Sequence, residues 1–247
     1  KVFFDLKQML HFFDKKNIKI VPKFDDVALL YHLCEGVSVK GYEDVLIPPD
    51  YDKNCLASSL LLAYENFSRK IDELGMSNLY GGVELPLLQI LFDMEKTGFK
   101  VDRNRVDELG KTYRSELSTL VEQIYELAGE RFNINSAKQL SEILFDKLGL
   151  PHNKKKSTGA DVLEEIASSH EIVPLILRYR KVNKLLTTYI DGLIPHIDEN
   201  DLVHTCFKQT ITNTGRLSSV EPNLQNIPIR SEESREVRSI YIARSKD

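Results

Sequence analysis

The spacing of apolar and polar residues divides the chain into a mixed first part and a strongly helical second part. Short apolar runs broken by Asp, Asn and Pro predict strands and short helices at the start, followed by a longer helix over residues 56–74. Pro48-Pro49-Asp50 and Gly81-Gly82 interrupt the pattern on either side of that helix. We place a domain boundary at the glycine pair.

Two long amphipathic helices dominate the part that follows. Apolar residues recur at intervals of three and four over residues 106–127, with Asp102 as a candidate N-cap and Gly129 just past the end. A matching pattern covers residues 174–193 and starts at a proline, which suits a first helical turn. Facing apolar stripes of this kind predict an antiparallel helical pair.

Shorter helices are expected between the two long ones. Ser136 and Gln139 have the spacing of a capping box at the start of a helix that ends near Leu148-Gly149. Thr158 precedes a second short helix expected over residues 159–168. The pattern therefore predicts a helical hairpin with a small helical tip.

Composition narrows the class of protein without identifying it. Of the 247 residues, 42% are apolar and 28% charged, which is typical of a folded domain and excludes a disordered chain. The net charge of −4 excludes a general attraction to polyanions. Three cysteines without metal-ligand spacing argue against disulfides and zinc and indicate a reducing compartment. No apolar stretch is long enough to cross a membrane, and no signal peptide is evident.

Positive charge gathers at the predicted tip and on the returning helix. Residues 136–160 contain five lysines and two acids, and four more cations follow: Arg178, Arg180, Lys181 and Lys184. Such a cluster could grip the phosphates of a duplex. The alternative, that these are ordinary solvated charges, stays open because charge spacing alone does not distinguish the two.

Residues 203–229 differ in composition and spacing from the helical stretches before them. A strand-like stretch leads to Gly215, which allows a tight turn next to Arg216, and then to residues 222–228, which are rich in Asn, Gln and Pro. Amides and a guanidinium can bind the minor-groove acceptors that every base pair presents. This favours a surface that binds duplex DNA whatever its base sequence. The alternative, a structural turn whose amides hydrogen-bond within the protein, stays open.

The stretch TNTGRLSSVEPNLQNIPIR at residues 212–230 resembles the signature at the palm entry of family A DNA polymerases, of the bacterial DNA polymerase I type. Three further stretches are similar to the same family. They are VELPLLQILFDMEKTGFKVD at 83–102 (thumb entry), FNINSAKQLSEILFDKLGLP at 132–151 (thumb tip) and YRKVNKLLTTYIDGL at 179–193 (returning thumb helix). The resemblance covers nearly all of residues 83–247.

The resemblance implies an α+β multidomain fold. Residues 1–82 would be part of a ribonuclease-H-like α/β domain of the 3′–5′ exonuclease type, residues 83–200 the helical-hairpin thumb with its tip, and residues 201–247 the first strands of the palm. Asp5 is a weak candidate for one metal-binding carboxylate of the first domain. The family's first acidic pair would lie before Lys1, which favours an inactive scaffold.

The resemblance also implies template-directed DNA synthesis with Mg²⁺ in the intact enzyme. The family's catalytic aspartates lie beyond Asp247, so we expect no catalytic residue, no bound metal and no activity in this chain alone. Its contribution would be to hold the primer–template DNA duplex, while deoxynucleoside triphosphates bind the intact enzyme. We expect a monomer in the bacterial cytoplasm, associated with the nucleoid and without membrane contact.

The family's DNA contacts carry over to two sets of positions. In the signature, Arg216 would reach the minor groove at the primer terminus, and neighbouring residues would contact the duplex: Thr214, Asn223, Gln225 and Asn226. On the thumb, contacts with phosphate are expected at Asn133, Asn135, Ser136, Lys138, Lys154, Lys155, Lys156, Arg180 and Lys184. The loop between Lys156 and Asp161 is shorter than the family's usual tip loop.

Two other functions stay open at this stage. A 3′–5′ exonuclease would shorten single strands in the presence of magnesium, and a non-enzymatic relative would bind DNA without synthesis. Because the chain begins with Lys and stops in a charged segment, we expect a fragment of a longer protein. The sequence after Asp247 would separate a polymerase from a non-enzymatic relative.

Overall fold

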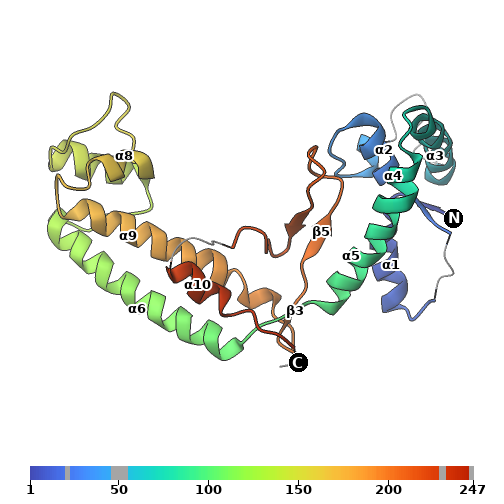
Figure 1. The fold of residues 1–247 in the computed structure, drawn as a ribbon. Helices are drawn as coiled ribbons and strands as arrows, with labels where there is room; N and C mark the ends of the chain where they lie inside the picture. Colours follow the sequence, from blue (N-terminus) through green and yellow to red (C-terminus); the bar gives the residue numbers. More distant parts are fainter. Residues whose placement is uncertain (20–22, 46–54, 228–231, 245–247) are drawn as a thin grey trace. The chain divides into compact units, whose positions relative to one another are not determined.

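The computed structural model describes residues 1–19, 23–45, 55–227 and 232–244, so that the expected turn at Pro48-Pro49-Asp50 and the end of the signature lie outside the described residues. The chain forms two compact units (Figure 1). The first comprises Lys1–Phe99 and Leu202–Asn226, and the second comprises Lys100–Asp201 and Ile227–Asp247. The chain changes from one unit to the other three times: within the short strand β3 (Phe99–Lys100), just before β4 (Leu202–Val203) and after Asn226.

The first unit begins with two strand–helix pairs. Strands β1 (Val2–Phe3) and β2 (Asp25–Asp26) are parallel, and each is followed closely by a helix, α1 (Leu6–Lys15) and α2 (Val27–Glu35). Parallel strands need a crossover connection, and here α1 is part of it. The mixture of strands and short helices predicted for the start of the chain is confirmed.

The carboxylate of Asp26 caps both of these helices. Its two oxygens accept hydrogen bonds from the backbone N–H of Leu29 in α2 and of Leu6 in α1, each at 2.7 Å. Asp5 adds a second cap on α1 by accepting from Gln8 N at 2.9 Å. These bonds satisfy amides that the first turn of a helix leaves without partners.

The rest of the first unit is helical apart from one hairpin. Helix α3 (Leu56–Glu73) confirms the helix expected over residues 56–74. A 3₁₀ turn, η1 (Tyr42–Asp44), precedes α3. After α3 comes a continuous helical run made of α4 (Ser77–Leu79), the π turn η2 (Tyr80–Glu84) and α5 (Leu85–Thr97). Gly81-Gly82 lies within this run. Strand β5 (Cys206–Lys208) pairs antiparallel with β6 (Ser218–Val220) and packs against α5.

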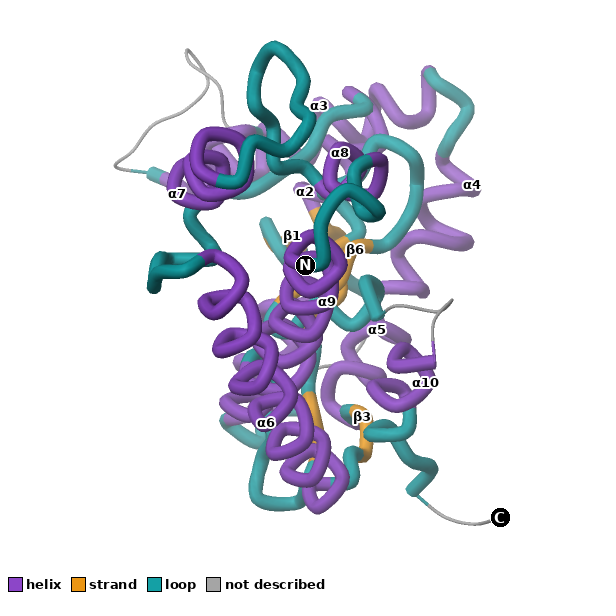
Figure 2. The backbone as a smooth tube through the Cα atoms, turned by 90° about the vertical axis from the view of Figure 1, so that its left-hand side faces the viewer, coloured by secondary structure: helices purple, strands orange, loops and turns teal. Residues whose placement is uncertain are grey.

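The second unit is built on an antiparallel pair of helices, α6 (Arg103–Ala128) and α9 (Ile172–Lys184) (Figures 1 and 2). Asp102 caps α6 by accepting from Arg105 N at 3.1 Å, and Gly129 ends it with a left-handed φ of 70°, as predicted. Helix α9 continues as the π turn η4 (Leu185–Asp191) and the 3₁₀ turn η5 (Ile194–His196). The last turns of the returning helix therefore depart from the α-helix that the spacing predicted.

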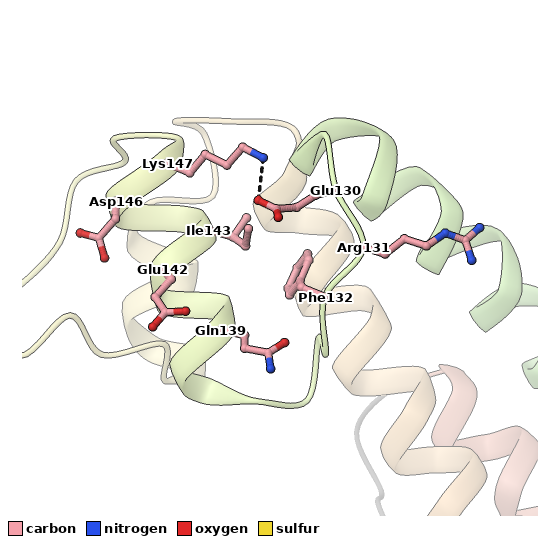
Figure 3. Close-up of a pocket in the computed structure, with 8 residues that line it drawn as sticks. All are labelled: Glu130, Arg131, Phe132, Gln139, Glu142, Ile143, Asp146 and Lys147. Atoms are coloured by element: carbon pink, nitrogen blue, oxygen red, sulfur yellow. Dashed lines mark hydrogen bonds and ion pairs between the residues drawn. The ribbon is translucent and has the colours of Figure 1, made fainter.

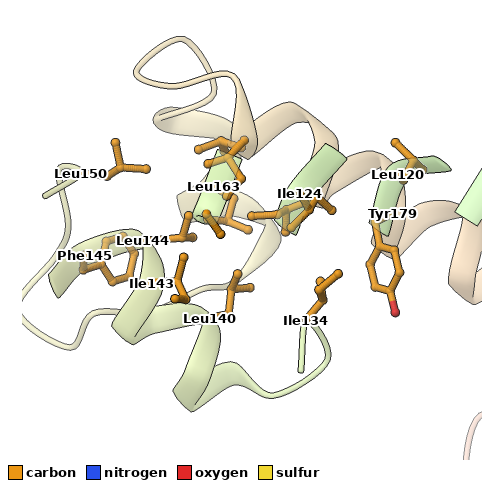
Figure 4. Close-up of a cluster of buried hydrophobic side chains, with 14 residues drawn as sticks. Leu120, Ile124, Ile134, Leu140, Ile143, Leu144, Phe145, Leu150, Leu163 and Tyr179 are labelled. Atoms are coloured by element: carbon orange, nitrogen blue, oxygen red, sulfur yellow. The ribbon is translucent and has the colours of Figure 1, made fainter. Parts of the chain in front are cut away.

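Short helices close the far end of this pair: α7 (Ala137–Ser141), η3 (Glu142–Lys147) and α8 (Ala160–Glu165). They enclose a core that includes the fully buried Ile124, Leu144 and Leu163 (Figure 4). The predicted helical tip is confirmed, but α8 is shorter than expected. Its N-cap position is taken by Gly159, and the chain leaves the helix after Glu165.

Helix α10 (Glu232–Arg238) returns to the α6–α9 pair. Val237 and Ile240 have no exposed surface. Backbone bonds extend the contact, because Asp102 N donates to the carbonyl of Ile240 at 2.8 Å and Ile242 N donates to that of Lys100 at 3.0 Å.

Candidate nucleic-acid interface

The loop between β5 and β6 presents Arg216. Gly215 has a φ of 71°, a left-handed conformation that favours glycine, and the hydroxyl of Thr212 donates to the carbonyl of Arg216. Thr214 and Arg216 are exposed, and the Arg216 guanidinium has no protein partner among the described residues. The predicted arginine therefore lies in a short, internally bonded turn.

The amides behind this turn are oriented by the backbone. Asn223 Oδ1 accepts from Gln225 N at 3.0 Å, and Gln225 Oε1 accepts from Ser219 N at 3.2 Å. Both side chains are exposed, and the bonds use their carbonyl oxygens. Their NH₂ groups, which are hydrogen-bond donors, donate to no group among the described residues. Asn226 is also exposed and lies in the same segment.

Two buried hydroxyls that were not among the predicted site residues hold this segment. Ser219 Oγ accepts from Leu224 N at 2.9 Å, and Thr205 Oγ1 donates to the carbonyls of Val220 and Pro222 at 3.1 and 2.8 Å. Ser219 is fully buried, and Thr205 is 3% exposed. The available signal was the position of Thr205 inside the strand-like stretch, since a buried hydroxyl there must bond to backbone.

A buried ion pair between α1 and α5 holds the backbone of strand β5. Lys7 of α1 pairs with Glu95 of α5, and both bond the backbone of Phe207: Lys7 Nζ donates to its carbonyl and Glu95 Oε1 accepts from its N–H, each at 2.6 Å. His11 lies 2.6 Å from the other oxygen of Glu95. Burial alone would raise the pKa of Glu95, but hydrogen bonds from His11 and Lys7 outweigh it and hold the pKa below its ordinary value.

No pattern in the sequence predicted the pairing of Lys7 with Glu95, although a signal existed. Glu95 follows Leu88, Leu91 and Phe92 at helical spacing, and those three side chains are buried. A carboxylate at a core position of an amphipathic helix requires a buried partner.

Four predicted thumb residues are brought together in the loop that starts α7. Ser136 Oγ accepts from Gln139 N at 3.4 Å, which is one half of the expected capping box. The other half has a different partner, because Gln139 Oε1 accepts from Asn133 N at 2.7 Å. Asn135 Nδ2 donates to Tyr179 Oη at 3.0 Å. The two asparagines thus order the loop, while Lys138 is exposed.

The three consecutive lysines of the tip differ in their surroundings. Lys154 and Lys155 are exposed, whereas Lys156 is partly buried and pairs with Asp146. Asn153 Oδ1 shapes the loop by accepting from Lys155 N and Ser157 N, each at 3.1 Å.

The cations of α9 line a groove of about 510 Å³ beside α8. Arg180 is partly buried, and its guanidinium donates to the carbonyl and the hydroxyl of Thr158. Burial lowers the pKa of Arg180 from its ordinary value. Lys184 is exposed at the same groove. Of the two cations predicted to bind phosphate here, one is already engaged by the tip loop.

A second hollow of the tip is unsuited to phosphate. It has a volume of about 590 Å³, and its eight lining residues include three carboxylates and two cations (Figure 3). One of these cations, Lys147, pairs with Glu130 at 2.7 Å. Asp146 pairs with Lys156, and a lining of three carboxylates against two cations disfavours a polyanion.

Asp5 serves as a helix cap, as described above, and the described residues contain no group of three or more His, Cys, Asp or Glu that could hold a metal ion. In the described part of the chain, no helix has both the length and the apolar composition needed to span a bilayer.

The chain is similar to known DNA polymerases over most of its length. DNA polymerase I of Caldicellulosiruptor bescii is 41% identical over 258 residues, covering 98% of this chain and 30% of that protein. The enzyme of Bacillus subtilis is 47% identical over 240 residues, covering 91% of this chain and 27% of that protein. The chain thus spans less than a third of these relatives.

A solved structure is similar over nearly the whole chain. The polymerase domain of Pol1 from M. smegmatis, in complex with DNA primer–template and dNTP, matches with a TM-score of 0.90 at 28% identity, covering 98% of this chain and 45% of that one. The pattern of DNA polymerase family A matches residues 103–247, which include the hairpin, its tip and the signature. The resemblance seen in the sequence is therefore confirmed, and the chain belongs to DNA polymerase family A.

Proposed function

We propose that this chain is the duplex-holding part of a polymerase that synthesises DNA on a template, with primer–template DNA and deoxynucleoside triphosphates as partners of the whole protein. The observation that carries the proposal is the orientation of the signature amides. Their oxygens are used by the backbone, so that NH₂ donors from Asn223 and Gln225 accompany the exposed Arg216.

Donors of this kind match the minor groove. Every base pair presents acceptors there at similar positions, so a row of donors can test the shape of a pair without reading its identity. A mispair displaces those acceptors and leaves Arg216 without its partner. The loss of a hydrogen bond to a charged group costs about 1.5–3 kcal/mol, which corresponds to roughly ten- to a hundredfold in rate.

Residues 100–200 of the second unit would form most of the thumb and contact phosphates, which fix position without specifying sequence. Lys138, Lys154, Lys155 and Lys184 are exposed and suited to this role. Asn133, Asn135 and Ser136 would support the contact by shaping their loop. In the intact enzyme Mg²⁺ would supply the metal chemistry of the family. Because the described residues offer no cluster of carboxylates for it, we assign no step in this chain to a metal.

We further infer that the first unit contains an inactive scaffold of the ribonuclease-H-like exonuclease type, with the thumb over residues 83–200 and the palm starting at residue 201. The parallel β1–β2 pair with its two helices supports this α/β assignment. The parent protein would act as a monomer in the bacterial cytoplasm.

Titration of a labelled primer–template with the chain tests the proposal. We expect affinity to fall steeply as salt rises, because phosphate contacts release counterions. Arg216→Ala should lower affinity for a paired primer terminus by about tenfold and abolish the preference over a mispaired one. Arg69→Ala, at an exposed arginine of the same unit, is the matched control and should change neither quantity. Equal losses in both variants, or binding insensitive to salt, would count against the proposal.

A further inference from the structure

Two cations at the α9 groove are engaged by carboxylates of neighbouring helices. Arg178 Nε donates to Glu116 of α6 at 2.5 Å, and Arg178 Nη1 donates to Glu233 of α10. Lys181 Nζ lies 2.9 Å from the other oxygen of Glu233. The Glu233 side chain is 19% exposed, so this carboxylate is largely withdrawn from water between two cations.

The contacts of α10 and the residues after it also include buried apolar side chains and a neutral donor. Val237 and Ile240 are fully buried, which stabilises the contact but does not by itself specify the rotation of the helix. Tyr113 Oη donates to Glu236 at 3.2 Å at one flank. The guanidinium of Arg178 bonds a carboxylate on each side, and charge-assisted bonds of this kind are directional. The backbone bonds of Ile240 and Ile242 fix the chain just after α10, and the ion cluster is the directional contact at the start of the helix itself.

We propose that Glu116, Arg178, Glu233 and Lys181 form an ionic latch that fixes the segment following the signature on the thumb hairpin. Arg178 and Lys181 are positioning residues of the latch and do not bind phosphate. This inference rests on the proposed function, because it distinguishes the cations that bind DNA from those that bind carboxylates of the protein. A cation already paired with a carboxylate does not neutralise a phosphate. It therefore releases no counterion from the DNA and adds nothing to the salt dependence of duplex binding.

Hydrogen exchange of the whole 247-residue chain tests the latch without DNA. We expect Arg178→Gln and Glu233→Gln each to speed exchange of the α10 amides by about two- to fivefold, as the loss of a partly exposed ion pair predicts. The double variant should exchange no faster than Glu233→Gln, because the pair is already broken. Lys184→Gln should leave α10 unchanged. Additive effects of the two substitutions, or no change in either variant, would overturn the latch.

Duplex binding provides the second readout. Lys184→Gln should reduce the steepness of log K against log salt by about 1, whereas Arg178→Gln should leave it unchanged. A loss of slope in Arg178→Gln equal to that in Lys184→Gln would show that Arg178 binds phosphate. If wild-type chain does not bind duplex at all, the proposed function fails, and the exchange experiment still decides the latch.

Discussion

The guanidinium of Arg180 has a partner that the charge pattern did not suggest. It is partly buried and donates to the carbonyl and hydroxyl of Thr158, at the point where the tip loop leads into α8. Burial lowers its pKa, but an arginine starts so far above neutral pH that it stays charged. Contact with phosphate remains a prediction, and any such contact shares the guanidinium with the tip loop.

Replacing this side chain should destabilise the second unit. In Arg180→Gln the buried Thr158 loses its charged donor, and we expect the free energy of unfolding to fall by about 1–3 kcal/mol in a urea titration. Lys184→Gln, one turn further along α9 and exposed, should stay within about 0.5 kcal/mol of the wild type. Equal stability of the two variants would mean that Thr158 does not depend on Arg180.

Helix ends show what local sequence can predict at the scale of an element. The caps of α6 at Asp102 and Gly129 were predictable, because each acts on backbone groups within its own first or last turn. The capping box at Ser136 was predictable only in part. Gln139 bonds Asn133 instead of the N-cap residue, because the preceding loop folds back over the start of the helix.

Asp26 gives the two-helix cap a dependence on pH. Burial raises its pKa from 3.8 to about 7, against hydrogen bonds from Leu6 and Leu29 that lower it. The native state therefore binds this proton more tightly than the unfolded chain does. The contribution of protonated Asp26 to the free energy of unfolding is therefore fully present below about pH 4 and is lost as pH rises through about 7.

Comparison with Asp26→Asn isolates this contribution. Relative to the variant, the wild-type free energy of unfolding should fall by up to about 4 kcal/mol between about pH 4 and pH 8, measured by urea titration across that interval. Asp93→Asn, at an exposed acid of the same unit, serves as the control. A difference that grows in the opposite direction would show that Asp26 is ionised in the native state.

At the scale of the whole molecule, each compact unit combines distant parts of the chain. Residues 202–226 complete the first unit, and residues 227–247 complete the second. The β5–β6 hairpin therefore depends on α1 and α5, which supply Lys7 and Glu95, while α10 depends on α6 and α9.

Removal of residues 227–247 should accordingly weaken the second unit alone. The truncation loses two fully buried side chains, Val237 and Ile240, at about 1.5–3 kcal/mol each. Hydrogen exchange of α6 and α9 should speed up, while α1 and α5 keep the protection that they have in the full chain. Unchanged exchange of α6 and α9 in this truncation would contradict the prediction.

The sequence by itself determined the helical hairpin, its caps and the family. Caps and apolar stripes depend on residues within a few positions of one another, and the signature is a contiguous stretch. Only the tertiary structure decided which charges are paired. Lys7 meets Glu95 across 88 positions and Arg178 meets Glu233 across 55, and no local pattern encodes such distances. The sequence does not show whether a lysine or arginine binds a carboxylate of the protein or a phosphate of a ligand, because only the fold brings the partner within bonding distance.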